Sequence, residues 1–183
     1  ATTLNPGDII IVSVNSDGTH PGGVNSNGFD FVSRVDLDAG TQIYFTDKGW
    51  DGSLAIPFWR NTTGEGLVRY TAPAGGLAKG TIVHYDDTMI TTFPSTGTGV
   101  WDMYSINGTT GALTLTTAIA SGFEPASAGD NILVFQDPTN TNTAASPNFI
   151  YGIGWSAGTT WISTGTPTTN NSWIPSGISS VGG

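Results

Sequence analysis

The chain has 183 residues and a formal net charge of −9, from 14 acidic and five basic residues. This length predicts one domain, residues 1–183, with a core of ordinary size. The acidic balance excludes proteins that bind nucleic acids or anionic membranes through a basic patch. Hydrophobic residues make up 37% of the chain and include six Trp, eight Phe and five Tyr, which favours a folded core over disorder.

Short apolar runs separated by turn residues predict strands along the whole chain. Asp8–Val14 is almost continuous Ile and Val, which is typical of a strand buried on both faces. In Thr41–Thr46, Ile43 and Phe45 are expected on one face of a sheet and Tyr44 on the other. The other predicted strands are Phe29–Val35, Leu67–Thr71, Thr81–Tyr85, Leu113–Ile119, Asn131–Gln136 and Asn148–Ile153.

Helical signals are nearly absent, because no window keeps helical spacing of apolar residues over about three turns. Many short strands with regular turns predict an all-β fold, a two-layer β-sandwich of jelly-roll type. We interpret 138–147 and 164–171 as long loops or tails, and 176–183 as a mobile tail. No run of about 18 apolar residues is present, so we expect no membrane span.

The acidic residues concentrate at Gly- and Asn-rich turns, with few basic residues near them in sequence. Clustered carboxylates repel one another, and Ca²⁺ relieves the repulsion by binding about six to eight oxygens. Asp and Asn are also good turn residues, and that plainer interpretation stays open for any single one. We predict a calcium site built from separate loops. The candidate ligands are Asn15, Asp17, Asp36, Asp38, Asp47, Asp51, Glu65, Asp86, Asp87 and Asp130.

Alternate loops of a β-sandwich collect at one end, so the acids in these loops are expected to converge. Asp36 and Asp38 share one face of an extended segment, which leaves Leu37 to point inward. Adjacent Asp86 and Asp87 cannot share a strand face. The pair therefore suits a ligand that one subunit contributes across a boundary to another.

The edges of an open sandwich need protection, which charged residues usually supply. This chain has few charges, so it either tolerates edge pairing or uses it. Residues 1–6 carry no charged side chain and precede a strongly apolar run. We interpret Thr2, Thr3 and Leu4 as a strand that could be donated to a neighbouring subunit. An ordinary first strand with a frayed start is the alternative.

Groups that support catalysis are few. The chain has no Cys, and we expect no enzyme. A glycosidase that uses Glu65 and Glu124 is the weakest hypothesis. A carbohydrate-binding or adhesive module that uses calcium is the stronger alternative, because Trp side chains stack on sugars; core packing explains the same residues equally well. The tryptophans are Trp50, Trp59, Trp101, Trp155, Trp161 and Trp173.

The sequence favours a secreted protein. The start at Ala1 suits a mature chain after removal of a signal peptide, although a fragment boundary gives the same start. Asn61, Asn107 and Asn170 fit the N-glycosylation pattern, which also recurs by chance in a chain rich in Asn and Thr. We expect an extracellular, cell-surface associated protein.

Several short motifs resemble a family of secreted, β-rich bacterial and archaeal surface domains. The motifs are Asn5-Pro6-Gly7-Asp8-Ile9, Asn15-Ser16-Asp17-Gly18, Ile43-Tyr44-Phe45-Thr46-Asp47 with Gly49-Trp50, Gly64-Glu65-Gly66, Ala72-Pro73-Ala74-Gly75-Gly76 and Gly129-Asp130-Asn131-Ile132-Leu133. Within that family the chain most resembles, over roughly residues 4–135, the cannula proteins of hyperthermophilic archaea. Those proteins are extracellular subunits that assemble into hollow tubules in the presence of calcium.

The resemblance implies a jelly-roll subunit, calcium at subunit boundaries and strand donation between neighbours. It implies a ligand role for the acids in the matching motifs, which are Asp17, Asp47, Glu65 and Asp130. The chain departs from the usual hyperthermophile pattern, because it is poor in ions and contains Asn-Gly pairs. We therefore expect a structural protein that assembles with itself into a helical homopolymer, in the form of tubules or filaments. Assembly and metal binding are expected to stabilise the folded subunit. Glycans are further expected partners.

Overall fold

The computed structural model of the chain describes residues 1–16, 27–53, 58–60, 65–86, 99–116, 123, 125–139, 141–156, 161–168 and 170–178. All helix and strand structure in these residues is β-strand, so the predicted all-β class is confirmed. The strands are β1 (Ile9–Asn15), β2 (Gly28–Ser33), β3 (Gln42–Thr46), β4 (Trp50–Asp51), β5 (Phe58–Trp59), β6 (Leu67–Thr71), β7 (Ile82–Asp86), β8 (Val100–Ile106), β9 (Leu113–Leu115), β10 (Gly129–Gln136), β11 (Asn148–Ser156), β12 (Trp161–Ile162) and β13 (Ser172–Trp173).

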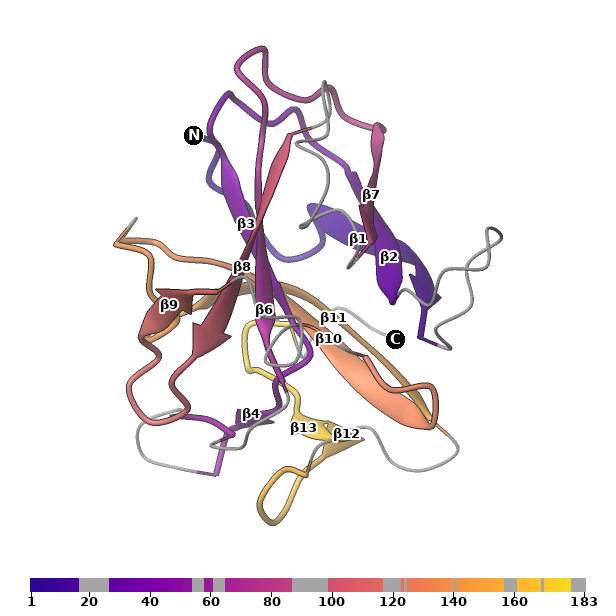
Figure 1. The fold of residues 1–183 in the computed structure, drawn as a ribbon, viewed down its shortest axis with the longest axis vertical. Helices are drawn as coiled ribbons and strands as arrows, with labels where there is room; N and C mark the ends of the chain where they lie inside the picture. Colours follow the sequence, from indigo (N-terminus) through magenta and orange to yellow (C-terminus); the bar gives the residue numbers. More distant parts are fainter. Residues whose placement is uncertain are drawn as a thin grey trace.

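Two antiparallel sheets form a β-sandwich, as predicted (Figure 1). The small sheet has the order β1-β2-β7, and the large sheet has the order β11-β10-β3-β6-β8-β9. Two short strand pairs, β4–β5 and β12–β13, lie outside these sheets, and Figure 1 shows β12 and β13 near its lower end. The jelly-roll connectivity stays a prediction.

The main core lies between the two sheets and consists largely of aromatic rings. Phe45 of β3 packs against Phe29 and Phe31 of β2, with ring centroids 4.7 and 5.0 Å apart. Trp101 of β8 contacts the same cluster, 5.7 Å from Phe45. Each such ring pair adds about 0.5–1.5 kcal/mol to what burial supplies. The predicted alternation is confirmed, because Ile43 and Phe45 face this core and Tyr44 faces away.

A second core covers the outer face of the large sheet. Tyr44 stacks on Phe135 there, and Trp50 and Trp59 of the β4–β5 pair pack over them. Ile178 is only 7% exposed and belongs to this core. The prediction of a mobile tail from residue 176 is therefore wrong for Ile178, because this large apolar side chain packs in the second core. Residues 179–183 lie outside the described part.

The small sheet is buried on one face only. Val12 of β1 is 52% exposed and Ile82 of β7 is 62% exposed. The prediction that Asp8–Val14 is buried on both faces is therefore wrong. The reason is that, in the described part of the chain, no third layer covers this sheet as the second core covers the large one.

Replacing Phe45 by Ala should destabilise the protein by about 3–5 kcal/mol, because the ring lies between the two sheets with no solvent exposure. Urea unfolding followed by tryptophan fluorescence measures this loss. Ile82→Ala is the control, since the side chain is exposed and its truncation should cost about 0.5 kcal/mol or less. Equal losses in the two variants would contradict the assignment of the core.

Candidate functional site

Five of the predicted calcium ligands lie at one end of the sandwich, which we call the acidic end. In the small sheet, Asn15 pairs with Gly28, which in turn pairs with Asp86. In the large sheet, Thr46 pairs with both Leu67 and Leu133. The residues just beyond these pairs at the same end of the sheet are Asp47, Glu65 and Asp130.

The two sheets bring these residues to the same end because β1 and β11 run side by side. Val14, next to Asn15, lines a common groove with Ile153 and Trp155 of β11. Trp155 pairs with Asp130 in the large sheet. These positions thus lie at the same end of the sandwich, but their convergence on one ion stays a prediction; Asp17 and Asp87 lie outside the described residues.

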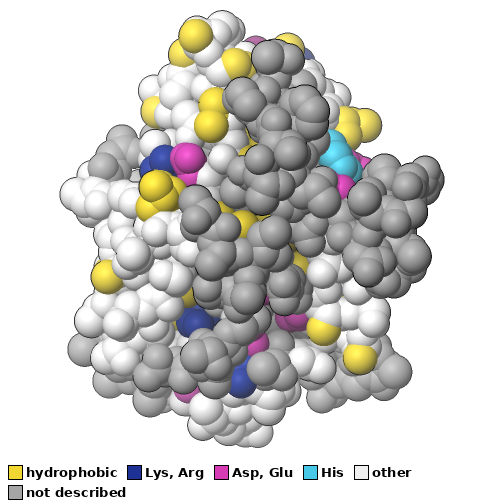
Figure 2. All heavy atoms as spheres, in the orientation of Figure 1, with side chains coloured by type: hydrophobic (Ala, Val, Ile, Leu, Met, Phe, Trp, Pro, Cys, Tyr) yellow, Lys and Arg dark blue, Asp and Glu magenta, His cyan; other side chains and the backbone are white. Residues whose placement is uncertain are grey.

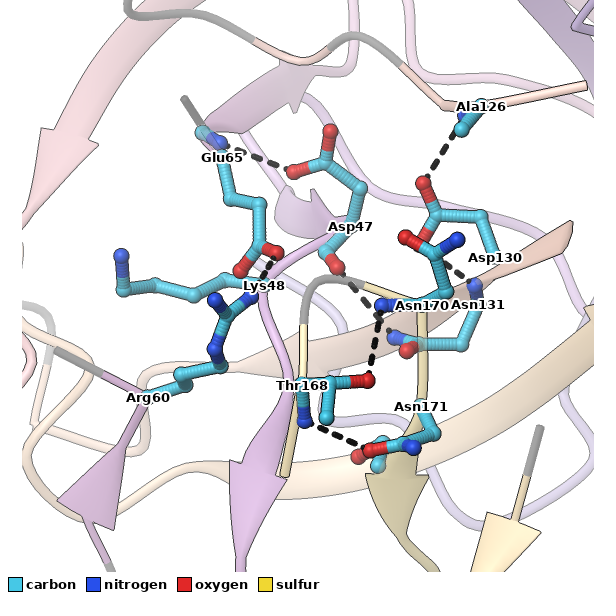
Figure 3. Close-up of polar contacts among 12 residues, drawn as sticks. Asp47, Lys48, Arg60, Glu65, Ala126, Asp130, Asn131, Thr168, Asn170 and Asn171 are labelled. Atoms are coloured by element: carbon cyan, nitrogen blue, oxygen red, sulfur yellow. Dashed lines mark hydrogen bonds and ion pairs between the residues drawn. The ribbon is translucent and has the colours of Figure 1, made fainter. Parts of the chain in front are cut away.

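Asp47, Glu65 and Asp130 belong to a buried polar cluster that also contains Lys48, Arg60 and Asn131 (Figure 3). Asp47 Oδ1 accepts a hydrogen bond from the Gly66 backbone N–H at 2.8 Å. Asp130 accepts from the backbone N–H groups of Ala126 and Asn131, at 2.9 and 2.8 Å. Glu65 Oε1 accepts from the Arg60 guanidinium. Each carboxylate therefore points at a different partner.

Basic side chains sit inside this cluster. Arg60 pairs with Glu65, and the buried Lys48 interacts electrostatically with Glu65 and Asp47. Burial lowers the pKa of Lys48, which the two acids oppose. Burial raises the pKa of Glu65, which Arg60 and Lys48 oppose. The premise that the acids lack basic neighbours is therefore wrong here, because the chain folds Arg60 back over the start of β6.

Two buried oxygens in the cluster lack a hydrogen-bond partner of normal geometry among the described residues. They are Oε2 of Glu65 and Oδ1 of Asn131. Their side chains point in different directions, Glu65 toward Arg60 and Asn131 toward the backbone carbonyl of Asp47. In the described part of the chain, no three His, Cys, Asp or Glu side chains form a group that could hold a metal ion. The calcium site stays a prediction.

The remaining predicted ligands lie apart from the acidic end or serve local turns. Leu37 is buried as predicted, while Asp36 Oδ1 accepts from the Lys79 backbone N–H at 2.8 Å. Asp38 lies 3.9 Å from the amino group of Ala1. Asp51 Oδ1 accepts from the backbone and hydroxyl of Ser53. The Asp51 contact is typical of a turn-forming carboxylate, whereas the Asp36 and Asp38 contacts join segments that are distant in sequence.

Two of the three predicted glycosylation positions lie among the described residues. Asn107 and Asn170 are exposed. Asn107 Oδ1 accepts the backbone N–H groups of Thr109 and Thr110. Asn61 lies outside the described residues.

The N-terminal segment lies on its own chain. Thr2 and Leu4 exchange hydrogen bonds with Gln136, and Leu4 is 1% exposed. The Leu4 carbonyl accepts from Asn148, and the Gly7 N–H donates to Ile150 O of β11. Thr3 is exposed. Donation of this segment to a neighbour stays a prediction, and it would exchange these contacts for the same ones on another copy.

One feature that the sequence predictions missed is a groove between β1 and β11, here called the edge groove. Each strand is the outermost one of its sheet among the described residues. Ile11, Val12, Val14, Ile153 and Trp155 line this groove, whose volume is about 330 Å³. Neither strand contains a charged residue. That absence of charge was visible in the sequence, but the proximity of the two strands was not.

An exposed polar row crosses the outer face of the small sheet. Asp30 of β2 accepts the Ser13 hydroxyl at 2.5 Å and lies 2.7 Å from His84 Nδ1. Figure 2 shows the histidine in cyan beside magenta acidic atoms. Serine and histidine both bond to the aspartate, so the row does not have the nucleophile–base arrangement of a hydrolase.

The described residues do not test the pair of carboxylates that the glycosidase hypothesis needs. Glu65 forms an ion pair with Arg60, and Glu124 lies outside the described residues. Among the described residues, no helix is long and apolar enough to cross a bilayer. Comparison with family models, curated proteins and solved structures finds no match for this chain.

The buried Asp130 predicts a pH-dependent stability. Burial raises its pKa from 3.8 to about 7, although the N–H groups of Ala126 and Asn131 oppose the shift. The folded state therefore binds the proton more tightly than the unfolded state, and this group's contribution to the free energy of unfolding falls as pH rises from about 4 to about 7. The slope is up to about 1.4 kcal/mol per pH unit.

Asp130→Asn should remove that component from urea unfolding measured between pH 4.5 and pH 8 in chelator. Asp38→Asn, at an exposed carboxylate, is the control and should keep the wild-type slope. An unchanged pH slope in Asp130→Asn would show that Asp130 titrates near its ordinary value.

Proposed function

We propose that this protein is a structural, self-assembling extracellular protein whose copies join through sheet edges into filaments or tubules, with calcium bridging acidic groups of neighbouring subunits. The edge groove carries the proposal. Monomeric sandwiches usually protect their edges with charged residues or Pro, and neither β1 nor β11 contains one. A bulge between Ile11 and Ser13 gives β1 some protection against strand pairing. Val12, within this bulge, is nevertheless exposed at the edge.

Exposed apolar side chains favour association at the edges. Val12 lies on β1, Ile82 on β7 and Leu115 on β9, and all three are more than half exposed. Each of these strands is outermost in its sheet among the described residues. An extended segment of another copy added there would gain main-chain hydrogen bonds and bury these side chains.

Calcium bridging is best supported at the small-sheet side of the acidic end. Asn15 and Asp86 lie on either side of Gly28 in register, and glycine places no side chain between them. Both are oxygen-bearing side chains of the kind that Ca²⁺ prefers. In the buried polar cluster, by contrast, Lys48 and Arg60 already balance much of the negative charge. The resemblance to the cannula proteins supports the same function.

Val12→Lys should prevent assembly while leaving the subunit folded, because a charged edge residue opposes strand addition. Val100→Lys is the matched control, since this valine is 47% exposed, lies on the large sheet and does not line the edge groove. Negative-stain microscopy and sedimentation of both variants measure the effect. Polymers of normal yield from Val12→Lys would remove the edge groove from the assembly contact.

Chelation should disperse the polymer, and excess Ca²⁺ should restore it. Asp86→Asn should require a higher Ca²⁺ concentration for half-maximal light scattering, because one charged ligand is lost. Asp51→Asn is the control, since that carboxylate serves its own turn. Light scattering that stays unchanged on adding chelator and then excess Ca²⁺ would count against calcium bridging.

A further inference from the structure

A second concave feature lies on the outer layer of the large sheet, away from the edge groove. This outer cleft, of about 520 Å³, opens between the start of β11 and the segments that carry β4 and β13. The residues that matter for its chemistry are Trp50, Ser146, Asn148, Trp173 and Ile174. None of these residues lines the edge groove.

Two tryptophans in the outer cleft are held in place by the fold. Trp50 makes edge-on contacts with Trp59 and Phe149, with ring centroids 5.0 and 4.9 Å apart. Trp173 donates its indole N–H to the Gly165 carbonyl at 3.0 Å. Its ring lies against Gly52, where an added Cβ would be only 3.3 Å away.

The position of Trp173 is therefore set before a ligand arrives, while its side chain is still partly exposed. A rigid aromatic surface that is already in place loses little conformational entropy on binding. The exposed Ile174 extends the apolar wall.

The polar groups of the outer cleft are neutral. Ser146 and Asn148 line it, and the Asn148 side chain is oriented by the bond from its Nδ2 to the Leu4 carbonyl at 3.1 Å. No charged side chain is among the described residues that line the cleft, although the chain carries a net charge of −9. A charged ligand would find no counter-charge there.

A ligand with a flat apolar face and neutral hydroxyl groups matches both parts of the cleft. The apolar C–H face of a pyranose ring packs on an indole, and its hydroxyls bond to neutral hydroxyl and amide groups. We propose that the outer cleft binds neutral pyranose units of a polysaccharide, with one ring stacked on Trp173. This binding is a separate activity from self-assembly and would attach the protein to neutral surface glycans.

The test uses all 183 residues of the chain, dispersed with chelator, and soluble neutral polysaccharides: β-glucan, mannan, xylan, galactan and their hexasaccharides. Affinity electrophoresis identifies the sugar, and titration calorimetry with the matching hexasaccharide gives the affinity. Trp173→Ala should lower the affinity about tenfold or more, as loss of one aromatic contact predicts. Trp161→Ala is the control, because Trp161 packs on the same core and does not line the cleft.

A second variant keeps the test decisive if Trp173→Ala unfolds. Ser146→Trp fills the cleft from an exposed loop position and should abolish sugar binding while urea stability stays near that of the wild type. Wild-type binding in Ser146→Trp, no binding of any neutral polysaccharide to the wild type, or binding of proline-rich peptides in place of sugars would each overturn the proposal. Assembly of Ser146→Trp in Ca²⁺ reports on the proposed structural function independently.

Discussion

Burial of both faces of the large sheet is the constraint on which the rest of the structure depends. β3 shows it within one strand, since Phe45 packs toward the small sheet and Tyr44 toward the outer layer. The outer layer comes from segments with little regular structure, yet it supplies Trp50, Trp59 and Ile178. Because both faces are occupied, contacts with other molecules are left to the sheet edges, the outer face of the small sheet and clefts in the outer layer.

Three of the five basic residues, Lys48, Arg60 and Arg69, compensate acids that are buried or partly buried. Arg60 pairs with Glu65, and Arg69 pairs with Asp102 at 2.6 Å on adjacent strands. A desolvated carboxylate needs such a partner, because an unpaired buried charge is costly. The two exposed basic residues, Arg34 and Lys79, lie outside β1 and β11, so no charge protects these strands. The same shortage of charge therefore connects the interior electrostatics to the proposed edge contacts.

The edge groove and the outer cleft use different parts of β11. Ile153 and Trp155 line the groove, whereas Asn148 and Phe149 line the cleft. Substitutions at one are therefore informative about that site alone. The proposed self-assembly and the proposed sugar binding would together make this a surface protein that forms a polymer and holds it to neutral glycans.

The sequence by itself determined the strands whose apolar pattern is local. The inward positions of Ile43, Phe45 and Leu37 follow from alternation, and Leu67–Thr71 was predicted with its observed bounds. The uncharged edges and the acidic turns were also visible, since each depends only on residue type at neighbouring positions.

Only the tertiary structure decided which second faces are covered and which charges are paired. β8 was not predicted, because Met103 packs on one face and Tyr104 on the other, and its Asp102 is compensated by Arg69 of another strand. The short strands β4, β5, β12 and β13 hold two residues each, too few to show a period. The second face of β1 stays exposed and the second face of β3 does not, because that difference depends on whether a segment distant in sequence folds over the strand.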